Sequence, residues 1–457
     1  MTENEIQQIL QALQVPVGYA EKADSSDITS DLESWKATTT CLLGELSKLV
    51  RENELSVAEQ ADVIAAAAAF DSHDVWSSPQ SYALATEILA EFSPPSLPLM
   101  FHLLETNVNP LFRSNLHPSL NLSTGRKLHR PAGGPMGSYD FYETQAWKAY
   151  PAAGNLVFWC LRHIQSQDYD RLWYLVIPPI MTFLDDYQVP FKLKGVKMVE
   201  ELLQHVPKEI LKRTGVDGLI LTSLNNCLAQ LDDTESPKLI QAAVSASLSL
   251  SLLTTTPGSS AQFDQLCTLL GERIIGTIWL YSHDKLGIVQ ASTDSLPPLL
   301  SALGLGCSRY LKALIPQLIH PLISVPLASP PFELQVSSLR ALTVVISECH
   351  YRMSHWKGTI LDGIGHCWVN LADTQSNAEA RQEDLKTHLR SSCQALAKAC
   401  PSIIEVSDTK YNSGKTSTAD IGLGGIPPAA RRRSRNVPRF GGRNCLSLTR
   451  YTLSRNV

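Results

Sequence analysis

The stretch LWYLVIPPIMTFL (residues 172–184) is apolar on almost every side, and Asp185-Asp186 follows it directly. A helix of this kind needs neighbours that cover more than one of its faces. Within residues 196–206, apolar side chains then recur at spacings of three and four, with Lys, Glu and Gln at the other positions. An apolar helix, an acidic turn and an amphipathic helix together predict a helical pair over residues 171–207.

The same pattern occurs a second time further along the chain. Residues 315–318 (IPQL) parallel residues 177–180 (IPPI), and residues 331–334 (PFEL) parallel residues 190–193 (PFKL). The offset, 315 − 177 = 138 residues, is close to three units of about 46, inside the period of ~40–47 residues of HEAT and armadillo helical pairs. A proline lies inside the apolar helix of both copies, where it should bend the axis. The sequence therefore predicts an all-α fold, a HEAT/armadillo-like α-solenoid of paired antiparallel helices.

Helix signals also organise the rest of the chain. Ser56 and Glu59 form a capping box before an alanine-rich helix, and Ser78-Pro79 begins the next helix. Residues 245–253 alternate as a strand would, but they lie inside a long apolar stretch, so we expect a helix. The predicted organisation is an N-terminal helix and polar linker (1–30), N-terminal helices (31–106), an irregular Pro/Gly-rich insertion loop (107–150), HEAT-like helical repeats (151–405) and a disordered basic tail (406–457).

Composition excludes several classes of protein. With 44% hydrophobic and 18% charged residues the chain can bury a large core. No apolar run approaches the ~18 residues that cross a bilayer. The acidic N-terminus has no apolar region typical of a signal peptide, so ten dispersed cysteines predict reduced, mostly buried thiols. The net charge of −5 divides into +8 for residues 406–457 and −13 for the first 405, which argues against nucleic-acid binding by the body.

Catalytic motifs are largely missing, and two groups of residues need weighing. Two cysteines and three histidines within nineteen positions could hold zinc, but their spacing matches no zinc motif, and core cysteines with surface histidines are favoured: Cys349, His350, His355, His366 and Cys367. The pair Asp185-Asp186 could supply acid–base chemistry, although two acids between helices are also typical of a turn and cap. We predict no enzyme, no cofactor and no metal.

The insertion loop is basic. It contains five basic residues, with no acid between Glu105 and Asp140: Arg113, Arg126, Lys127, His129 and Arg130. Two interpretations remain open, a docking surface for an acidic partner and a solvated loop. The aromatic residues that follow, Tyr139, Phe141, Tyr142 and Trp147, are expected first to anchor the loop to the solenoid and second to lie in an interface.

The basic tail contains RRRSR (residues 431–435), which is similar to a nuclear-import run. An equally serious alternative is an extension, such as intron read-through, that adds nothing to the fold. We predict that deletion of residues 407–457 leaves folding and partner binding intact and changes only the nuclear distribution.

Several short motifs resemble one known family. These are residues 173–180 (WYLVIPPI), 184–186 (LDD), 191–195 (FKLKG) and 212–215 (KRTG), and upstream residues 117–118, 124–127 (TGRK) and 145–148 (QAWK). Together they resemble the signatures of the Tel-two-interacting protein two family, over about residues 107–260.

The resemblance implies a non-enzymatic scaffold of the TTT complex, with Tel-two and Tti-one homologues as partners. This co-chaperone works with HSP-ninety and an R2TP-type adaptor to mature phosphatidylinositol-3-kinase-related (PIKK) kinases. Its subunits are also linked to the ASTRA complex and to telomere maintenance. Cytoplasmic and nuclear locations are expected. The residues predicted at or near the partner surface are Arg126, Lys127, Trp147, Trp173, Lys192, Lys194 and Arg213. The alternatives are a nuclear-transport-type or other protein-binding α-solenoid, and an enzyme of unrecognised type.

Overall fold

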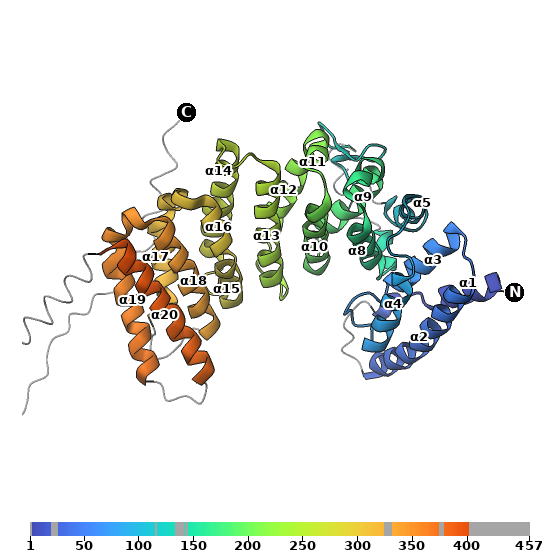
Figure 1. Cartoon of the computed structure of the whole chain (residues 1–457), viewed down its shortest axis with the longest axis horizontal. Coiled ribbons are helices and arrows are strands. Elements are labelled where there is room, and N and C mark those ends of the chain that lie inside the picture. The colour runs from blue at the N-terminus through green and yellow to red at the C-terminus, as the bar shows by residue number, and fades with distance from the viewer. Residues whose placement is uncertain are drawn as a thin grey trace, which may run out of the picture. The chain divides into compact units, whose positions relative to one another are not determined.

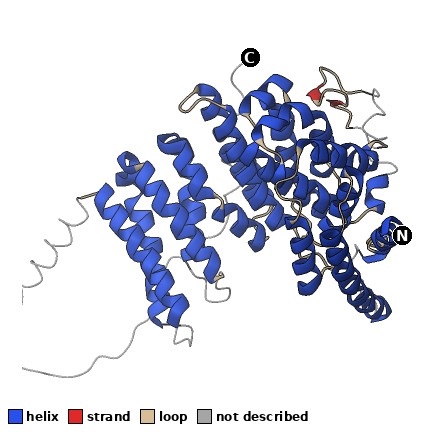
Figure 2. Ribbon diagram, turned by 45° about the vertical axis from the view of Figure 1, so that its right-hand side comes forward, coloured by secondary structure: helices blue, strands red, loops and turns tan. Residues whose placement is uncertain are grey.

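The computed structural model describes residues 2–19, 26–114, 117–132, 141, 145–323, 331–373 and 379–401. The predicted tail at 406–457 lies outside the described residues, as do Tyr139 and Tyr142 of the insertion. Residues Met1–Pro401 form one compact unit. Within the described part of the chain, helices dominate and the strands are confined to one small hairpin (Figures 1 and 2).

The helices follow one another along the chain, and the insertion separates α6 from α8. The α-helices are α1 (Thr2–Ala12), α2 (Ser26–Glu52), α3 (Val57–Ala68), α4 (Pro79–Ala90), α5 (Leu97–His102), α6 (Asn109–Phe112), α8 (Ala153–His163), α9 (Tyr169–Leu184), α10 (Val189–His205), α11 (Lys208–Thr214), α12 (Val216–Cys227), α13 (Ser236–Thr254), α14 (Ser260–Cys267), α15 (Leu286–Asp294), α16 (Leu296–Leu303), α17 (Leu311–Ile319), α18 (Phe332–Glu348), α19 (Met353–Asp373) and α20 (Glu379–Ala399). Two segments are π-helical, η2 (Leu103–Val108) and η6 (Thr268–Trp279), and the strands are β1 (Leu120–Asn121) and β2 (Arg126–Lys127).

From α9 onward the helices form pairs that stack on one another. The pairs are α9 with α10, α12 with α13, η6 with α15, α17 with α18, and α19 with α20. The second helices of successive pairs (α10, α13, α15, α18 and α20) pack side by side (Figure 1), and α8 packs against α10. This stacking confirms the predicted all-α solenoid. None of the described helices is long and apolar enough to cross a membrane.

The repeat found in the sequence corresponds to equivalent helices. α9 and α17 are the first helices of two pairs that lie three pairs apart, and they contain Pro178 and Pro316 at interior positions. Their partners, α10 and α18, are each 17 residues long. The apolar character of α9 follows from its burial, since side chains on most of its faces, including Ile177 and Ile180, are shielded from solvent.

The predicted caps are present at the N-terminal helices. The Glu59 N–H donates to Ser56 Oγ (3.3 Å), and the Ser56 N–H donates to Glu59 Oε2 (2.8 Å). Ser78 caps α4 in the same way, with Pro79 at the first helical position. Residues 245–253 lie inside α13, as predicted.

Some details differ from the expectation. α2 begins at Ser26, inside the segment assigned to the polar linker, and η2 and α6 continue the helix to Phe112, inside the segment assigned to the irregular insertion. The insertion also contains the β1–β2 hairpin, with Leu120 opposite Lys127 and Asn121 opposite Arg126. Strands of two residues give no period that could be recognised in the sequence.

Candidate partner-binding surface around the insertion

The β1–β2 hairpin is held against α9 by one tryptophan. Trp173 is 3% exposed, and its Nε1–H donates to the Gly125 carbonyl oxygen at 3.0 Å. Gly125 has a φ of +63°, and a Cβ there would lie 2.7 Å from Trp173 Cδ1. Both the left-handed backbone and the close approach of the indole require glycine at this position. The sequence motifs at 124–127 and 173–180 therefore meet in space.

A histidine connects the start of the insertion to the end of α9. His117 Nε2 lies 2.8 Å from Asp185 Oδ2, and its Nδ1 accepts the Ser119 N–H at 3.2 Å. This pattern fits the imidazole tautomer with its proton on Nε2. Asp185 Oδ2 also accepts the Ser223 hydroxyl of α12 at 2.9 Å. Asp185 thus joins the insertion, the α9–α10 turn and the next helical pair.

Asp186 organises the turn itself. Its carboxylate is fully buried, and Lys148 Nζ lies 3.0 Å from Oδ2 and 3.2 Å from Oδ1. The Gln188 N–H donates to Oδ1 at 2.8 Å, which satisfies a backbone amide at the start of α10. The Lys148 ammonium also lies over the rings of Tyr187 (4.3 Å) and Phe191 (4.7 Å). Of the two interpretations of the Asp pair, the turn and cap is therefore the one that the geometry supports.

Trp147 anchors the end of the insertion, the first of the two roles expected for the aromatic residues. It is 1% exposed, and its ring centroid lies 4.5 Å from that of Phe183, 4.9 Å from that of Phe191 and 6.0 Å from that of Phe112. Phe141 is also buried and packs edge-on against His117.

Three of the seven predicted surface residues are therefore buried. Trp147 and Trp173 hold the insertion in place, and Lys192, 6% exposed, directs its Nζ to the Leu184 carbonyl oxygen at 3.4 Å. These three side chains are covered in the described fold, and their place at or near a partner surface stays a prediction. Lys194 is half-buried, where its Nζ lies 3.4 Å from Asp74 Oδ1 and 5.6 Å from the Trp76 ring centroid.

The other three are exposed and lie on neighbouring elements. Arg126 and Lys127 form β2, and the Lys127 side chain lies against the α11–α12 junction, where a Cβ at Gly215 would be 3.5 Å from Lys127 Cβ. Arg213, near the end of α11, pairs with Asp170 of α9. α11 adds exposed Lys208 and Lys212, which were not among the residues predicted from the sequence.

We call the five residues of β2 and α11 the basic patch: Arg126, Lys127, Lys208, Lys212 and Arg213. Within the described residues, only Arg213 of these five forms an ion pair. The same part of the surface carries three acids, Asp170, Glu209 and Asp217, so a small net positive charge remains. The patch can attract and orient an acidic segment.

The candidate zinc cluster is not assembled. Cys349 and Cys367 are buried, whereas His350, His355 and His366 are exposed. No group of three or more possible metal-ligating side chains occurs within the described part of the chain. The arrangement is that of core cysteines and surface histidines, and burial raises the pKa of the Cys367 thiol to about 11.

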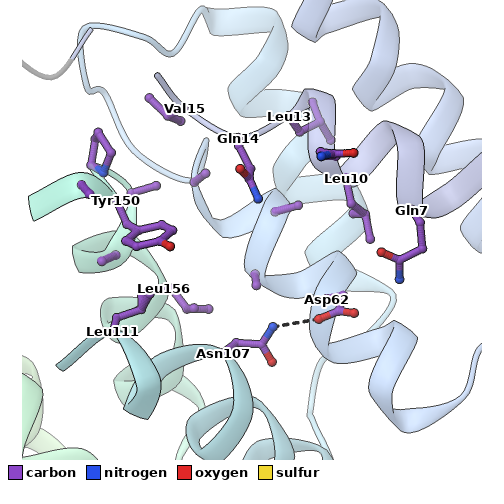
Figure 3. A pocket seen from close by; sticks show the side chains of 18 of the residues that line it. Gln7, Leu10, Leu13, Gln14, Val15, Asp62, Asn107, Leu111, Tyr150 and Leu156 are labelled. Atoms are coloured by element: carbon purple, nitrogen blue, oxygen red, sulfur yellow. Dashed lines mark hydrogen bonds between the residues drawn. The ribbon is translucent and has the colours of Figure 1, made fainter. Parts of the chain in front are cut away.

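A separate groove lies between the N-terminal helices and α8 (Figure 3). Its volume is about 680 Å³, and its floor is formed by apolar side chains that include Leu10, Leu13 and Leu156. Asp62, the acidic residue in the lining of the groove, accepts a hydrogen bond from Asn107 Nδ2 at 2.8 Å. Tyr150, 51% exposed, lies at the rim of the groove. Segments far apart in the sequence form this groove, so no local sequence pattern predicts it.

Comparison with known proteins gives two findings. A family model described as the Tti2 family matches residues 63–330, which include the insertion and all helices from α4 to α17. Among solved structures, the crystal structure of an engineered protein is similar at 11% identity over 86% of this chain and 92% of that chain, with a TM-score of 0.36.

Proposed function

This chain belongs to the Tti2 family, and from that membership we propose that it is a non-enzymatic scaffold subunit of the TTT co-chaperone complex that binds Tel-two and Tti-one homologues. The observation that carries the proposal is the match over residues 63–330, which covers the insertion and its anchors. A solenoid without an assembled catalytic group in its described part fits this role, because stacked helical pairs present long surfaces to other proteins.

The finer parts of the proposal follow from the family. Through the complex, the chain supports the maturation and stability of PIKK-family kinases together with HSP-ninety and an R2TP-type adaptor. A link to the ASTRA complex and to telomere maintenance, and locations in the cytoplasm and nucleus, belong to the same proposal.

We place one docking contact at the basic patch. Arg126 and Lys127 project from a hairpin that Trp173 and Gly125 fix to the solenoid, so the partner meets a preorganised surface. The described body is otherwise rich in acids, and a positive region on such a surface steers an acidic partner and fixes its orientation. Exposed charges of this kind are screened beyond about 8 Å at physiological ionic strength, so the contact should weaken with salt.

Co-expression of the tagged full chain with its Tel-two and Tti-one homologues tests the proposal. We expect a stable ternary complex by size-exclusion chromatography. Recovery of the folded chain without either homologue in mild salt would overturn the assignment.

The docking contact has its own test in the same system. Arg126→Glu with Lys127→Glu should reduce recovery of the homologues roughly tenfold and should remove most of the salt dependence. The matched control reverses two exposed lysines elsewhere, Lys312→Glu with Lys398→Glu, and should leave recovery unchanged. Equal recovery by both double variants would leave the proposed complex membership standing but would reject the basic patch as the docking site.

A further inference from the structure

A small pocket with several polar side chains in its lining lies between two successive helical pairs, away from the insertion. Its volume is about 180 Å³, and residues from α12, α13, α14 and the start of η6 line it. α12 and α13 each contribute two residues spaced four apart, which places both on one helix face. The lining is Leu221, Asn225, Ser247, Ser251, Asp264, Gln265, Thr268 and Leu269.

Two polar atoms in this lining have no partner. Ser247 is 1% exposed, and its Oγ makes no hydrogen bond within the described structure. A helical serine commonly satisfies itself by donating to the carbonyl four residues earlier, which Ser247 does not do. The buried Gln265 Oε1 also lacks a donor. Unpaired buried polar atoms are unusual in folded proteins and call for a ligand or ordered water.

The pocket offers acceptors and negative charge. Asp264 is exposed at its edge and forms no ion pair with another described residue. Asn225 and Thr268 add an amide and a hydroxyl, and no lysine, arginine or histidine lines the pocket. A ligand that complements these groups carries several N–H donors and a positive charge.

We propose that this pocket binds the guanidinium group of an arginine side chain presented by another protein. A guanidinium offers five N–H donors in a fixed plane, whereas an ammonium offers three around a point. Hydrogen-bond acceptors distributed over three helices match the guanidinium, the wider of these two groups. The carboxylate of Asp264 pairs with the charge, and the two unpaired atoms, Gln265 Oε1 and Ser247 Oγ, accept N–H donors of the guanidinium.

The π-helical η6 contributes to this geometry. Thr268 and Leu269 begin η6, a π-helical segment that runs to Trp279. π-helical turns are rare and are frequent at functional sites. The pocket thus lies where a regular helix gives way to an irregular one.

The proposal goes beyond membership of the TTT complex and does not depend on it, because the probe is a small molecule. N-acetyl-arginine amide is titrated into the full-length chain, and binding is followed by saturation-transfer NMR and by thermal shift. We expect saturable binding that is at least tenfold weaker for the neutral isostere N-acetyl-citrulline amide and severalfold weaker for N-acetyl-lysine amide.

Variants locate the binding. Asp264→Asn and Ser247→Ala should each weaken it about tenfold, and Glu272→Gln, on an exposed acid of η6 outside the pocket, should leave it unchanged. The Asp264 variant changes an exposed side chain, so it tests the proposal even if the Ser247 variant is unstable. No saturable binding, which would leave ordered water as the occupant, or equal binding by wild type and Asp264→Asn would overturn the proposal.

Discussion

Gly195 is the point at which α10 crosses the end of α9, and its replacement by alanine tests the packing of this pair. A Cβ at position 195 would lie 2.3 Å from the Leu184 nitrogen, 2.5 Å from Leu184 Cα and 2.6 Å from the Phe183 carbonyl carbon. All three atoms belong to the backbone, so no side-chain rotation can relieve the overlap. The two helices must move apart.

Two effects of the substitution oppose each other. Alanine in a helix interior is favoured over glycine by about 0.5–1 kcal/mol. Overpacking a well-packed site costs about 1–3 kcal/mol, and sometimes more. Non-bonded carbon atoms prefer separations of about 3.5–4.0 Å, so α10 has to shift by roughly 1 Å against neighbours on both sides. We therefore expect a net loss of about 2 kcal/mol or more in the free energy of unfolding.

Urea unfolding followed by circular dichroism measures the loss in the free energy of unfolding. Because repeat arrays need not unfold in one step, hydrogen exchange of the α9 and α10 amides shows where stability is lost. Gly44→Ala in α2 and Gly358→Ala in α19 are matched controls, since a Cβ at either position meets no atom within 4 Å. They should stabilise the chain by about 0.5–1 kcal/mol. A Gly195→Ala chain as stable as these controls would refute the close contact.

Three further predictions concern other parts of the chain. Trp173→Phe removes the Nε1–H that donates to the Gly125 carbonyl oxygen, which should lower the free energy of unfolding by about 1–3 kcal/mol and speed limited proteolysis at residues 120–127. An unchanged cleavage rate would show that Trp173 does not anchor the hairpin. Burial raises the pKa of Glu200 despite its hydrogen bond with Ser245, so the folded state disfavours the ionised carboxylate and stability falls as pH rises through the folded-state pKa. Glu200→Gln should flatten that fall and raise the thermal midpoint at pH 7 relative to wild type, and an unaltered pH profile would exclude Glu200 as its cause. Deletion of residues 407–457 should leave the thermal midpoint and complex assembly unchanged and alter only the nuclear share seen by microscopy, whereas loss of assembly would assign the tail a role in binding.

The sequence predicts the fold well because the signals of a solenoid are local. The period of about 46 residues, the caps at Ser56 and Ser78 and the apolar character of α9 each depend on residues close together in the chain. The exposure of single side chains depends on contacts that are not local. Trp173 belongs to a motif that resembles a family signature, but its burial depends on the insertion, through a contact with Gly125 that lies 48 positions away in the chain.

The acidic turn after α9 shows how one local motif can hold distant segments. In a solenoid each pair contacts mainly its neighbours, so an insertion needs its own attachment. Asp185 accepts from His117 of the insertion and Ser223 of α12, and Asp186 accepts from Lys148 and from the Gln188 N–H just before α10. A carboxylate suits both positions because one such group can accept several hydrogen bonds at once. On the proposed docking of a partner at the basic patch, replacement of Asp185 or Asp186 should weaken the complex indirectly, because these carboxylates hold the two ends of the insertion.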